Sequence, residues 1–257
     1  METTTSVAVP PFLKLLANQV RWQLLEELAR SDRRGQELVG LIRQPQNLLS
    51  YHLRRLREHA LVRERRSAAD RRDVYYSIDI QRCRDLFFTA GEQLHPGLAE
   101  TGKAGSNEWT AEGPRVRVLF LCTHNSARSQ MAEGILRLLS GGEVEVASAG
   151  TEATRVHPLA IQEMAAMRID ISQQRSKSMD LFVDQPFDYV VTVCDRASES
   201  CPVFPGDPER IHWSIPDPSA VEGDEETRVR AFHAAAVDLT ARIRYLLIAI
   251  RRQRQAL

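Results

Sequence analysis

The first half of the chain predicts short helices, because its apolar residues recur every three or four positions. The stretch Leu13 to Ala29 follows this spacing, and Gln36 to Ile42 predicts a second, shorter helix. Pro45 stands where a further helix begins after a tight turn, since proline is favoured in the first turn of a helix. One face of this further helix is apolar, with Leu49, Leu53 and Leu56 at helical spacing. This order predicts a helix-turn-helix.

The face of that helix opposite the leucines is polar, and a hairpin is expected to follow it. Val62 to Ser67 and Asp73 to Ile78 have strand-like patterns, and they flank the charged loop Ala68 to Arg72. Such a hairpin forms a wing over a phosphate backbone. We therefore expect a winged helix-turn-helix that binds DNA. Its expected contacts are Asn47, Ser50, Tyr51, Arg54, Arg55, Arg71 and Arg72.

The second half begins with a continuous apolar run that ends in a polar loop. Val116 to Leu121 predicts a buried strand, Cys122 follows it, and Ser129 to Leu139 predicts a helix. A long amphipathic helix is expected over Glu225 to Gln255, where apolar residues alternate at three- and four-residue spacing. Docking of this helix on a sheet of the second half is favoured over a coiled coil, because an α/β sheet with parallel strands needs helices on both faces.

Length and charge divide the chain into two domains. The 257 residues exceed the usual size of one domain. Residues 1–105 hold 17 Lys and Arg against 13 Asp and Glu, a net charge of +4, whereas the remainder holds 17 against 21, a net charge of −4. Residues 95–114 are rich in Gly, Pro and small polar residues, as linkers are. We expect a DNA-binding domain over 1–94, a linker over 95–114 and a second domain over 115–257.

Several classes of protein are disfavoured by composition. The longest strongly apolar run, Tyr245 to Ile250, is too short to span a bilayer, so no membrane association is expected. Residues 1–11 lack the basic-then-apolar pattern of a secretory signal. Four cysteines in a chain of this length indicate thiol chemistry in the cytoplasm rather than a disulfide framework. The histidines and cysteines do not follow zinc-ligand spacing, so no metal site is expected.

Cys122 opens the run Cys-Thr-His-Asn-Ser-Ala-Arg, which ends at Arg128. A loop between a buried strand and a helix points backbone N–H groups at one spot, where a tetrahedral anion binds and a thiolate is stabilised. Arg128 adds a planar fork for two anion oxygens. We therefore expect a nucleophilic thiol at Cys122 and an oxyanion-binding loop of Thr123, His124, Asn125, Ser126, Ala127, Arg128 and Ser129.

This run resembles the Cys-x5-Arg loop shared by low-molecular-weight protein tyrosine phosphatases and the arsenate reductases of the same fold. Those families also share a downstream Asp-Pro that supplies a general acid, which corresponds here to Asp217. Cys194 and Cys201 resemble the redox pair of thioredoxin-coupled arsenate reductases. The resemblance runs from about Arg115 to the C-terminus and includes Ala147 to Thr151, Phe187 to Val191 and His212 to Ser214.

The resemblance implies a flavodoxin-like second domain with a central parallel sheet, and a thiol relay. Cys122 would attack arsenate held by the loop and Arg128, while Asp217 protonates the departing oxygen. Cys194 would then attack Cys122, arsenite would leave, and Cys201 would move the disulfide to where thioredoxin reduces it. The resemblance therefore implies arsenate as substrate and thioredoxin as electron donor, with no bound cofactor.

The first half resembles the arsenic-responsive winged-helix repressor family through Leu49 to Val62 and Asp70 to Ser77. That resemblance implies operator DNA as a partner and a homodimer formed through this domain. The family often senses arsenite with a cysteine pair on the helix before the recognition helix, but Gln36 to Ile42 has none. This half offers only Cys83, so either two copies of Cys83 pair in a dimer, or sensing lies elsewhere, or this half does not sense arsenite.

Two other functions are compatible with the same residues. A tyrosine phosphatase would keep its aryl phosphate turnover without Cys194, whereas a reductase would lose arsenate turnover. A regulator whose second domain senses redox state or oxyanions would release DNA on ligand binding with little turnover. The operator, the inducer and the coupling between the domains are not specified by the residues.

Overall fold

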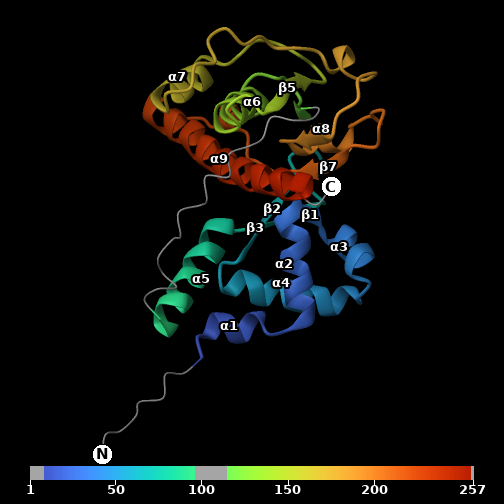
Figure 1. Cartoon of the computed structure of the whole chain (residues 1–257), viewed down its shortest axis with the longest axis vertical. Helices are drawn as coiled ribbons and strands as arrows, with labels where there is room; N and C mark the ends of the chain where they lie inside the picture. Colours follow the sequence, from blue (N-terminus) through green and yellow to red (C-terminus); the bar gives the residue numbers. More distant parts are fainter. Residues whose placement is uncertain (1–8, 96–114, 256–257) are drawn as a thin grey trace, which may run out of the picture. The chain divides into compact units, whose positions relative to one another are not determined.

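The computed structural model describes residues 9–95 and 115–255, and the chain forms two compact units. The helices and strands up to α5 belong to the first unit, and those from β4 onward belong to the second (Figure 1). The linker expected over residues 95–114 lies outside the described residues, except for His95.

The first unit consists of helices around a small antiparallel sheet. Its strands are ordered β1-β3-β2, and β2 pairs with β3 from Val62↔Ile78 to Arg66↔Val74. The two strands expected from the sequence therefore form the hairpin. The elements are α1 (Pro11–Leu16), α2 (Gln19–Arg30), β1 (Arg33–Arg34), α3 (Gly35–Ile42), α4 (Gln46–Glu58), β2 (Val62–Arg66), β3 (Val74–Ile78) and α5 (Ile80–Leu94).

The helical stretch expected over Leu13 to Ala29 is wrong at one point, because it is broken into α1 and α2. The break occurs at Asn18, whose backbone is extended and whose side chain accepts a hydrogen bond from the Arg21 N–H at 3.1 Å. Asparagine is favoured as an N-cap because this bond satisfies a donor of the first helical turn. The apolar period continues across the break, so the spacing alone did not reveal it.

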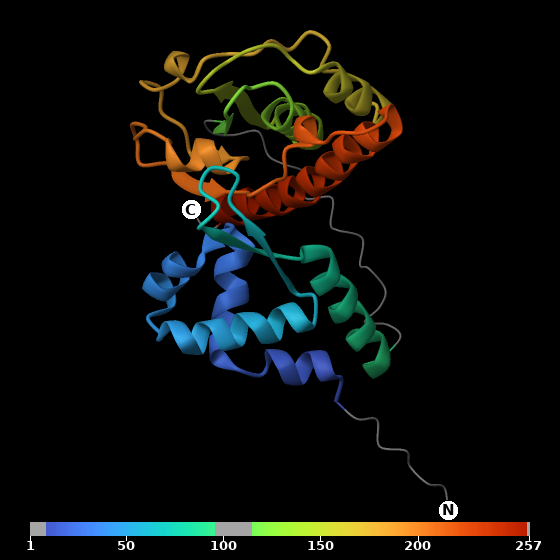
Figure 2. The same ribbon diagram turned by 180° about the vertical axis from the view of Figure 1, so that it is seen from behind.

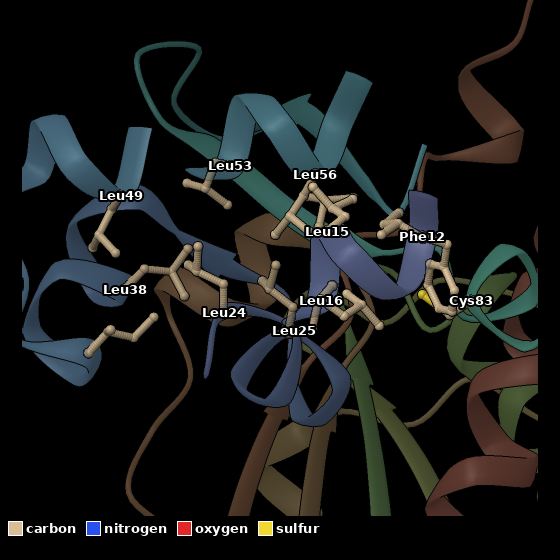
Figure 3. Close-up of a cluster of buried hydrophobic side chains, with 14 residues drawn as sticks. Phe12, Leu15, Leu16, Leu24, Leu25, Leu38, Leu49, Leu53, Leu56 and Cys83 are labelled. Carbon is tan, nitrogen blue, oxygen red and sulfur yellow. The ribbon is translucent and has the colours of Figure 1, made fainter. Parts of the chain in front are cut away.

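The core of the first unit is a cluster of leucines between the helices, and the close-up in Figure 3 shows them pointing toward one another. Leu24, Leu38 and Leu56 are fully buried there. The predicted apolar face of α4 lies in this cluster, so burial of that face sets the rotation of the helix. Cys83 of α5 lies at the edge of the cluster near Phe12 (Figure 3).

The second unit contains a four-stranded sheet ordered β5-β4-β6-β7, with every strand pair parallel. This confirms the expected parallel sheet. In such sheets, sites form at the carboxyl ends of the strands where the order of connection reverses. The elements are β4 (Val116–Cys122), α6 (Arg128–Leu139), β5 (Val144–Gly150), α7 (Pro158–Ala166), the 3₁₀ turn η2 (Met179–Leu181), β6 (Tyr189–Thr192), α8 (Asp195–Glu199), β7 (Glu209–His212), the 3₁₀ turn η3 (Pro218–Ala220) and α9 (Glu225–Gln255).

The long helix expected at the end of the sequence is present as α9, which packs along α6 and α7 within the unit (Figures 1 and 2). Its apolar stripe is buried, including Phe232, Leu239 and Ile243. Tyr189 of β6 donates a hydrogen bond to Gln253 near the end of α9 at 2.5 Å. The stripe is therefore used inside the second unit, mainly against α6. Among the described residues, no helix combines the length and apolar character needed to cross a membrane.

Candidate active site

Cys122 is the last residue of β4, and its side chain is buried at the floor of the loop that leads into α6. The Asn125 N–H donates a hydrogen bond to Cys122 Sγ at 3.1 Å, and Ser129 Oγ lies 2.9 Å from the same sulfur. The expected order of strand, polar loop and helix is therefore present, and the thiol contacts a backbone N–H and a hydroxyl group.

The carbonyl groups of this loop are tied to the segment after β5. Four backbone bonds do this: Thr151 N–H to Cys122 O at 3.3 Å, Glu152 N–H to Thr123 O at 2.8 Å, Thr154 N–H to His124 O at 3.1 Å, and His157 N–H to Ser126 O at 2.8 Å. In a planar trans peptide the N–H points opposite to the carbonyl. Fixing the carbonyls outward therefore turns the following N–H groups inward, which makes a concave site for a tetrahedral anion.

Asn125 holds the middle of the loop with both its backbone and its amide. Its φ of 47° lies in the left-handed region, which asparagine tolerates better than most residues. The amide nitrogen donates to Ser129 Oγ and Ser148 Oγ, both at 2.9 Å, and the amide oxygen accepts from Gln130 Nε2 at 2.9 Å and the Lys177 N–H at 2.8 Å. Asn125 therefore links the oxyanion loop to Ser129, Ser148, Gln130 and Lys177.

Sequence reasoning missed the charged group behind this amide. Ser148 donates to Glu133 Oε2 at 2.5 Å, and the Glu133 carboxylate also pairs with Lys177 at 3.2 Å and Arg137 at 2.5 Å. The Glu133 side chain is buried. The two cations offset the cost of removing its charge from water. A glutamate inside the apolar spacing of α6 was the available signal.

Gly150 was also missed as a site residue, although it belongs to the stretch that carries the family resemblance. A Cβ atom at this position would lie 2.6 Å from the Thr123 carbonyl oxygen and 2.7 Å from the Asn125 nitrogen. Both are backbone atoms of the loop, so neither yields without moving the loop itself. Only glycine lets β5 lie this close to the anion site.

Arg128 and Asp217 are brought together as expected. Arg128 Nη2 lies 2.9 Å from Asp217 Oδ2, and Arg128 Nη1 donates to the Ile215 carbonyl at 2.9 Å. The guanidinium is largely buried, whereas about a third of the Asp217 side chain is exposed. Both terminal nitrogens of the guanidinium are therefore engaged, one by a carboxylate and one by a carbonyl oxygen.

The two further cysteines lie in different surroundings. Cys194 follows β6 at the start of α8 and is buried, with its sulfur 3.5 Å from Thr123 Oγ1 of the oxyanion loop. Cys201 lies beyond α8 and is half-buried. All four cysteines of the chain are unpaired thiols in this structure. Cys122 and Cys194 thus share one edge of the sheet, with Cys201 nearer to solvent.

Burial and charge act on Cys122 in opposite directions. Burial, followed by the neighbouring Cys194, raises the pKa of the Cys122 thiol, while Ser129, Arg128 and the Asn125 N–H act to lower it. Burial also raises the pKa of Cys201, against a smaller opposite effect of Arg210. The Cys122 thiolate therefore depends on the donors and on Arg128 for its formation.

A second polar cluster lies beside Cys194 and was not expected. Asp195 opens α8, is fully buried, and accepts a hydrogen bond from Ser214 Oγ at 2.7 Å. Its Oδ1 atom also lies 3.3 Å from His212 Nε2, and His212 Nδ1 lies 2.9 Å from Thr192 Oγ1. These contacts join the start of α8 to the segment that leads from β7 to Asp217.

The other predicted loop residues vary in exposure. His124 is exposed, and its Nε2 atom lies 3.7 Å from Glu152 Oε2. Ser126 is half-buried and Ala127 is buried at the N-terminal boundary of α6. No group of three or more His, Cys, Asp or Glu side chains within residues 9–95 and 115–255 is arranged to hold a metal ion.

The residues predicted to contact DNA lie on α4 and on the loop between β2 and β3. Tyr51 and Arg54 are exposed on α4, and the Arg54 guanidinium lies 5.9 Å from the centre of the Tyr51 ring. Asn47 and Ser50 are exposed on the same helix. Arg55 is half-buried and pairs with Glu58 at 2.7 Å. Arg71 and Arg72 are exposed in the loop. Arg72 pairs with Asp70 at 2.6 Å and lowers the pKa of that carboxyl to about 2. Part of the arginine charge is therefore balanced locally.

Cys83 is buried among apolar side chains of the first unit. Burial, with a smaller contribution from Asp79, raises the pKa of its thiol to about 11. Thiolate is the form that binds arsenite, so the environment of Cys83 disfavours a sensing role.

Comparison with known proteins shows which family the second unit resembles. The model of the family described as low molecular weight phosphotyrosine protein phosphatase matches residues 117–256. An arsenate reductase of Halalkalibacterium halodurans is 42% identical over 127 residues, which are 49% of this chain and 91% of that protein. An arsenate reductase of Bacillus subtilis is 39% identical over the same shares of the two chains. A solved structure described as an arsenate reductase in oxidized state is 31% identical, covers 52% of this chain and 98% of its own, and has a TM-score of 0.47. Because the family model matches more than half of the sequence, the chain belongs to the low molecular weight phosphotyrosine protein phosphatase family.

Proposed function

We propose that the second unit reduces arsenate to arsenite through a thiol relay of Cys122, Cys194 and Cys201, with thioredoxin as the electron donor. The observation that carries the proposal is a second buried thiol, Cys194, in contact with the oxyanion loop that holds Cys122. Phosphate ester hydrolysis needs one thiol, whereas reduction of arsenic needs two electrons from a pair of thiols. Relatives at 39–42% identity bear the name arsenate reductase, which supports the same choice.

Arsenate binds in the concave site that the oxyanion loop forms. The inward N–H groups of the loop and the fork of Arg128 bind the oxygens of a tetrahedral dianion. Asp217 occupies one side of Arg128 in the structure, so an entering oxyanion takes over that contact. Asp217, released from the guanidinium but still beside it, then carries the proton for the departing oxygen.

The relay balances in three steps. Cys122 thiolate forms a bond to arsenic, and a hydroxyl group of arsenate leaves as water after it takes the proton from Asp217. Cys194 thiolate then attacks Cys122 Sγ; the sulfur–sulfur bond forms, the sulfur–arsenic bond breaks, and its electron pair stays on arsenic, which leaves as arsenite. Cys201 thiolate attacks Cys194 Sγ and frees Cys122, after which the dithiol of thioredoxin is oxidised as it reduces the Cys194–Cys201 disulfide.

The decisive experiment is arsenate-dependent oxidation of NADPH in the presence of thioredoxin and thioredoxin reductase. Wild type should turn over repeatedly, and Cys194→Ser should not. Cys201→Ser should release one equivalent of arsenite per chain and then stop, because the disulfide cannot move outward. Repeated turnover by Cys201→Ser would contradict the relay.

A phosphatase is the competing enzyme, because the anion loop and Asp217 would serve it equally well. It predicts hydrolysis of an aryl phosphate that survives Cys194→Ser. The same two proteins therefore decide between the candidates when they are assayed with p-nitrophenyl phosphate. Turnover of the ester by both proteins, with no arsenate reduction by either, would assign the phosphatase.

For residues 9–95, the proposal is a winged-helix regulator that binds operator DNA through α4 and the β2–β3 loop. What supports it is the rotation of α4, whose leucines are buried while Tyr51 and Arg54 are exposed. Arg54→Ala should weaken binding to the operator, measured by fluorescence anisotropy. The matched control is Arg30→Ala, because Arg30 is an exposed arginine at the end of α2. Equal losses in the two variants would reduce the role of Arg54 to nonspecific charge.

The homodimer proposed for this regulator would use the outer face of α5. Phe87, Phe88 and Leu94 leave 47%, 40% and 77% of their surface exposed there. If two copies of α5 pair antiparallel around Phe88, Arg84 of each copy faces Glu92 of the other, which makes the surface complementary to itself. Phe88→Glu should give a monomer by light scattering, whereas Leu41→Glu, at an exposed leucine on α3, should not.

The remaining candidate is a regulator whose second unit senses oxyanions or redox state with little turnover. It predicts that arsenate, or oxidation of Cys194 and Cys201, changes operator affinity while the reductase assay stays silent. Anisotropy measured with reduced and oxidised protein decides this. Unchanged affinity together with sustained arsenate turnover would exclude the sensor.

A further inference from the structure

The oxyanion loop has a weak point at its C-terminal end. The carbonyl of Ser126 is the last of the loop carbonyls that the segment after β5 holds, and the His157 N–H holds it at 2.8 Å. The next peptide N–H, that of Ala127, points into the anion site only while this bond keeps the peptide plane in place. The position of the His157 main chain therefore affects the direction of the Ala127 N–H in the anion site.

The side chain of His157 fixes that main chain between two helices. Its Nδ1 atom accepts a hydrogen bond from the Leu159 N–H at 3.1 Å, which caps the N-terminus of α7. Its ring stacks on Phe232 of α9, with centroids 4.8 Å apart and planes inclined by 29°. Phe232 is fully buried, so the ring rests against a rigid surface.

We infer that His157 is a positioning residue for the oxyanion loop, and that only its neutral imidazole performs this role. The inference deepens the proposed arsenate reductase, but its effect on anion binding does not depend on turnover. His157 has no catalytic task here, because it acts through the Ser126 carbonyl rather than on the substrate.

The requirement for the neutral form follows from hydrogen-bond chemistry. A neutral imidazole has one donor and one acceptor, and here Nδ1 must be the acceptor because it receives the Leu159 N–H. A protonated imidazole has two donors and no acceptor. Protonation would therefore set two N–H groups against each other, break the cap of α7 and free the segment that ends in the His157 N–H.

Charged groups from three segments face the ring. Arg155 lies two residues earlier, Asp217 comes from the segment before η3, and Arg228 comes from the first turns of α9. Burial and then Arg228 lower the pKa of His157, Asp217 acts to raise it, and Arg155 lowers it further. The surroundings thus keep the ring neutral, and its protonation falls at more acidic pH than for a free histidine.

Two substitutions test the hydrogen-bond acceptor and the aromatic ring of His157 separately. His157→Asn keeps a side-chain oxygen that caps a helix and does not titrate, whereas His157→Phe keeps a ring to stack on Phe232 but removes the acceptor. Phosphate is the probe, and its dissociation constant is measured by titration calorimetry between about pH 5 and pH 8. At pH 7.5, phosphate should bind His157→Phe about fivefold more weakly than wild type, the equivalent of losing one cap, and His157→Asn within about twofold of wild type.

The pH dependence is the sharper readout. The ratio of wild-type to His157→Asn affinity cancels the ionisation of phosphate and of Cys122, which both proteins share. The ratio should be constant near neutral pH and should fall as His157 protonates, because only wild type then loses its cap. His59→Asn is the control, because His59 is a half-buried histidine at the end of α4 in the first unit, and phosphate affinity of this variant should follow wild type throughout.

The outcomes separate this inference from the proposed function. A ratio that stays flat across the whole pH range, or a His157→Phe variant that binds phosphate as wild type does, would overturn the role of His157. Absence of arsenate turnover in wild type would remove the proposed function and leave the phosphate result standing. Arsenate kcat and KM measured on the same variants should show the loss chiefly in KM, because the cradle acts first on binding.

Discussion

Two buried cysteines, Cys122 and Cys83, lie in opposite chemical surroundings. They expose 3% and 9% of their surface, so burial hardly distinguishes them. Cys122 meets the Asn125 N–H, Ser129 and Arg128, whereas Cys83 lies at the edge of a leucine cluster and beside Asp79. Donors and a cation around a buried thiol, rather than exposure, decide whether it serves as a nucleophile.

The largest effect expected from this difference is on turnover. Cys122→Ser should lower arsenate reduction by at least about 1000-fold, because the hydroxyl cannot supply the first thiolate. Cys83→Ser should leave kcat within about twofold, since Cys83 belongs to the other unit. Both values come from the coupled NADPH assay. An equal loss in the two variants would mean that the first unit takes part in catalysis.

The second test compares two glycines instead of two cysteines. Gly150→Ala should lower kcat/KM about 100-fold, because its Cβ would collide with backbone atoms of the oxyanion loop and displace them. Gly40→Ala, in α3 of the first unit, meets nothing within 4 Å. It should leave kcat/KM unchanged and raise the stability of the first unit by about 0.5–1 kcal/mol. Full activity in Gly150→Ala would show that the loop tolerates displacement.

Alkylation should rank the thiols directly. With iodoacetamide at pH 8, Cys201 should react before Cys83, whose pKa of about 11 leaves roughly one thiolate in a thousand molecules. Phosphate should protect Cys122, which lies beneath the anion site, and should not protect Cys83 or Cys201. Peptide mapping by mass spectrometry gives the three rates. Protection of Cys83 by phosphate would place an anion site in the first unit.

The smallest expected effect is on stability at alkaline pH. Cys83 ionises at about 11 in the folded chain and at about 8.5 when unfolded, so the folded state holds its proton more tightly. Its contribution is complete below about pH 8.5 and is lost as the pH rises toward 11, because the unfolded thiol ionises first. The stability advantage of wild type over Cys83→Ala should shrink in this range. Hydrogen exchange of α5 in urea measures it, and a constant advantage would argue against the raised pKa.

The local parts of the site were predictable from the sequence. The strand before Cys122, the loop and Arg128 are contiguous, and a continuous apolar run followed by polar residues marks the strand and the loop. Asp217 was found through the family resemblance, since a lone Asp-Pro is otherwise typical of a turn. The hairpin of the first unit followed from two short strand patterns that flank a charged loop.

The parts that the sequence concealed depend on contacts between distant segments. Ser148 accepts from Asn125 and donates to Glu133 only after α6 and β5 pack together, so the pairing of these residues cannot be read from the sequence. In the sequence, Gly150 resembles a glycine at the end of any strand. Its close approach to Thr123 exists only in the folded sheet. The apolar period continues across the helix break at Asn18, because a period carries no information about caps.

The backbone hydrogen bonds that hold the oxyanion loop have a consequence for engineering. Its carbonyls are fixed by N–H groups of residues 151–157, which are main-chain atoms that no substitution removes except one to proline. The side chain of His124, which is exposed, takes no part in that scaffold. Position 124 is therefore where libraries of variants could alter which oxyanion is preferred while the fold of the loop is inherited unchanged from its neighbours.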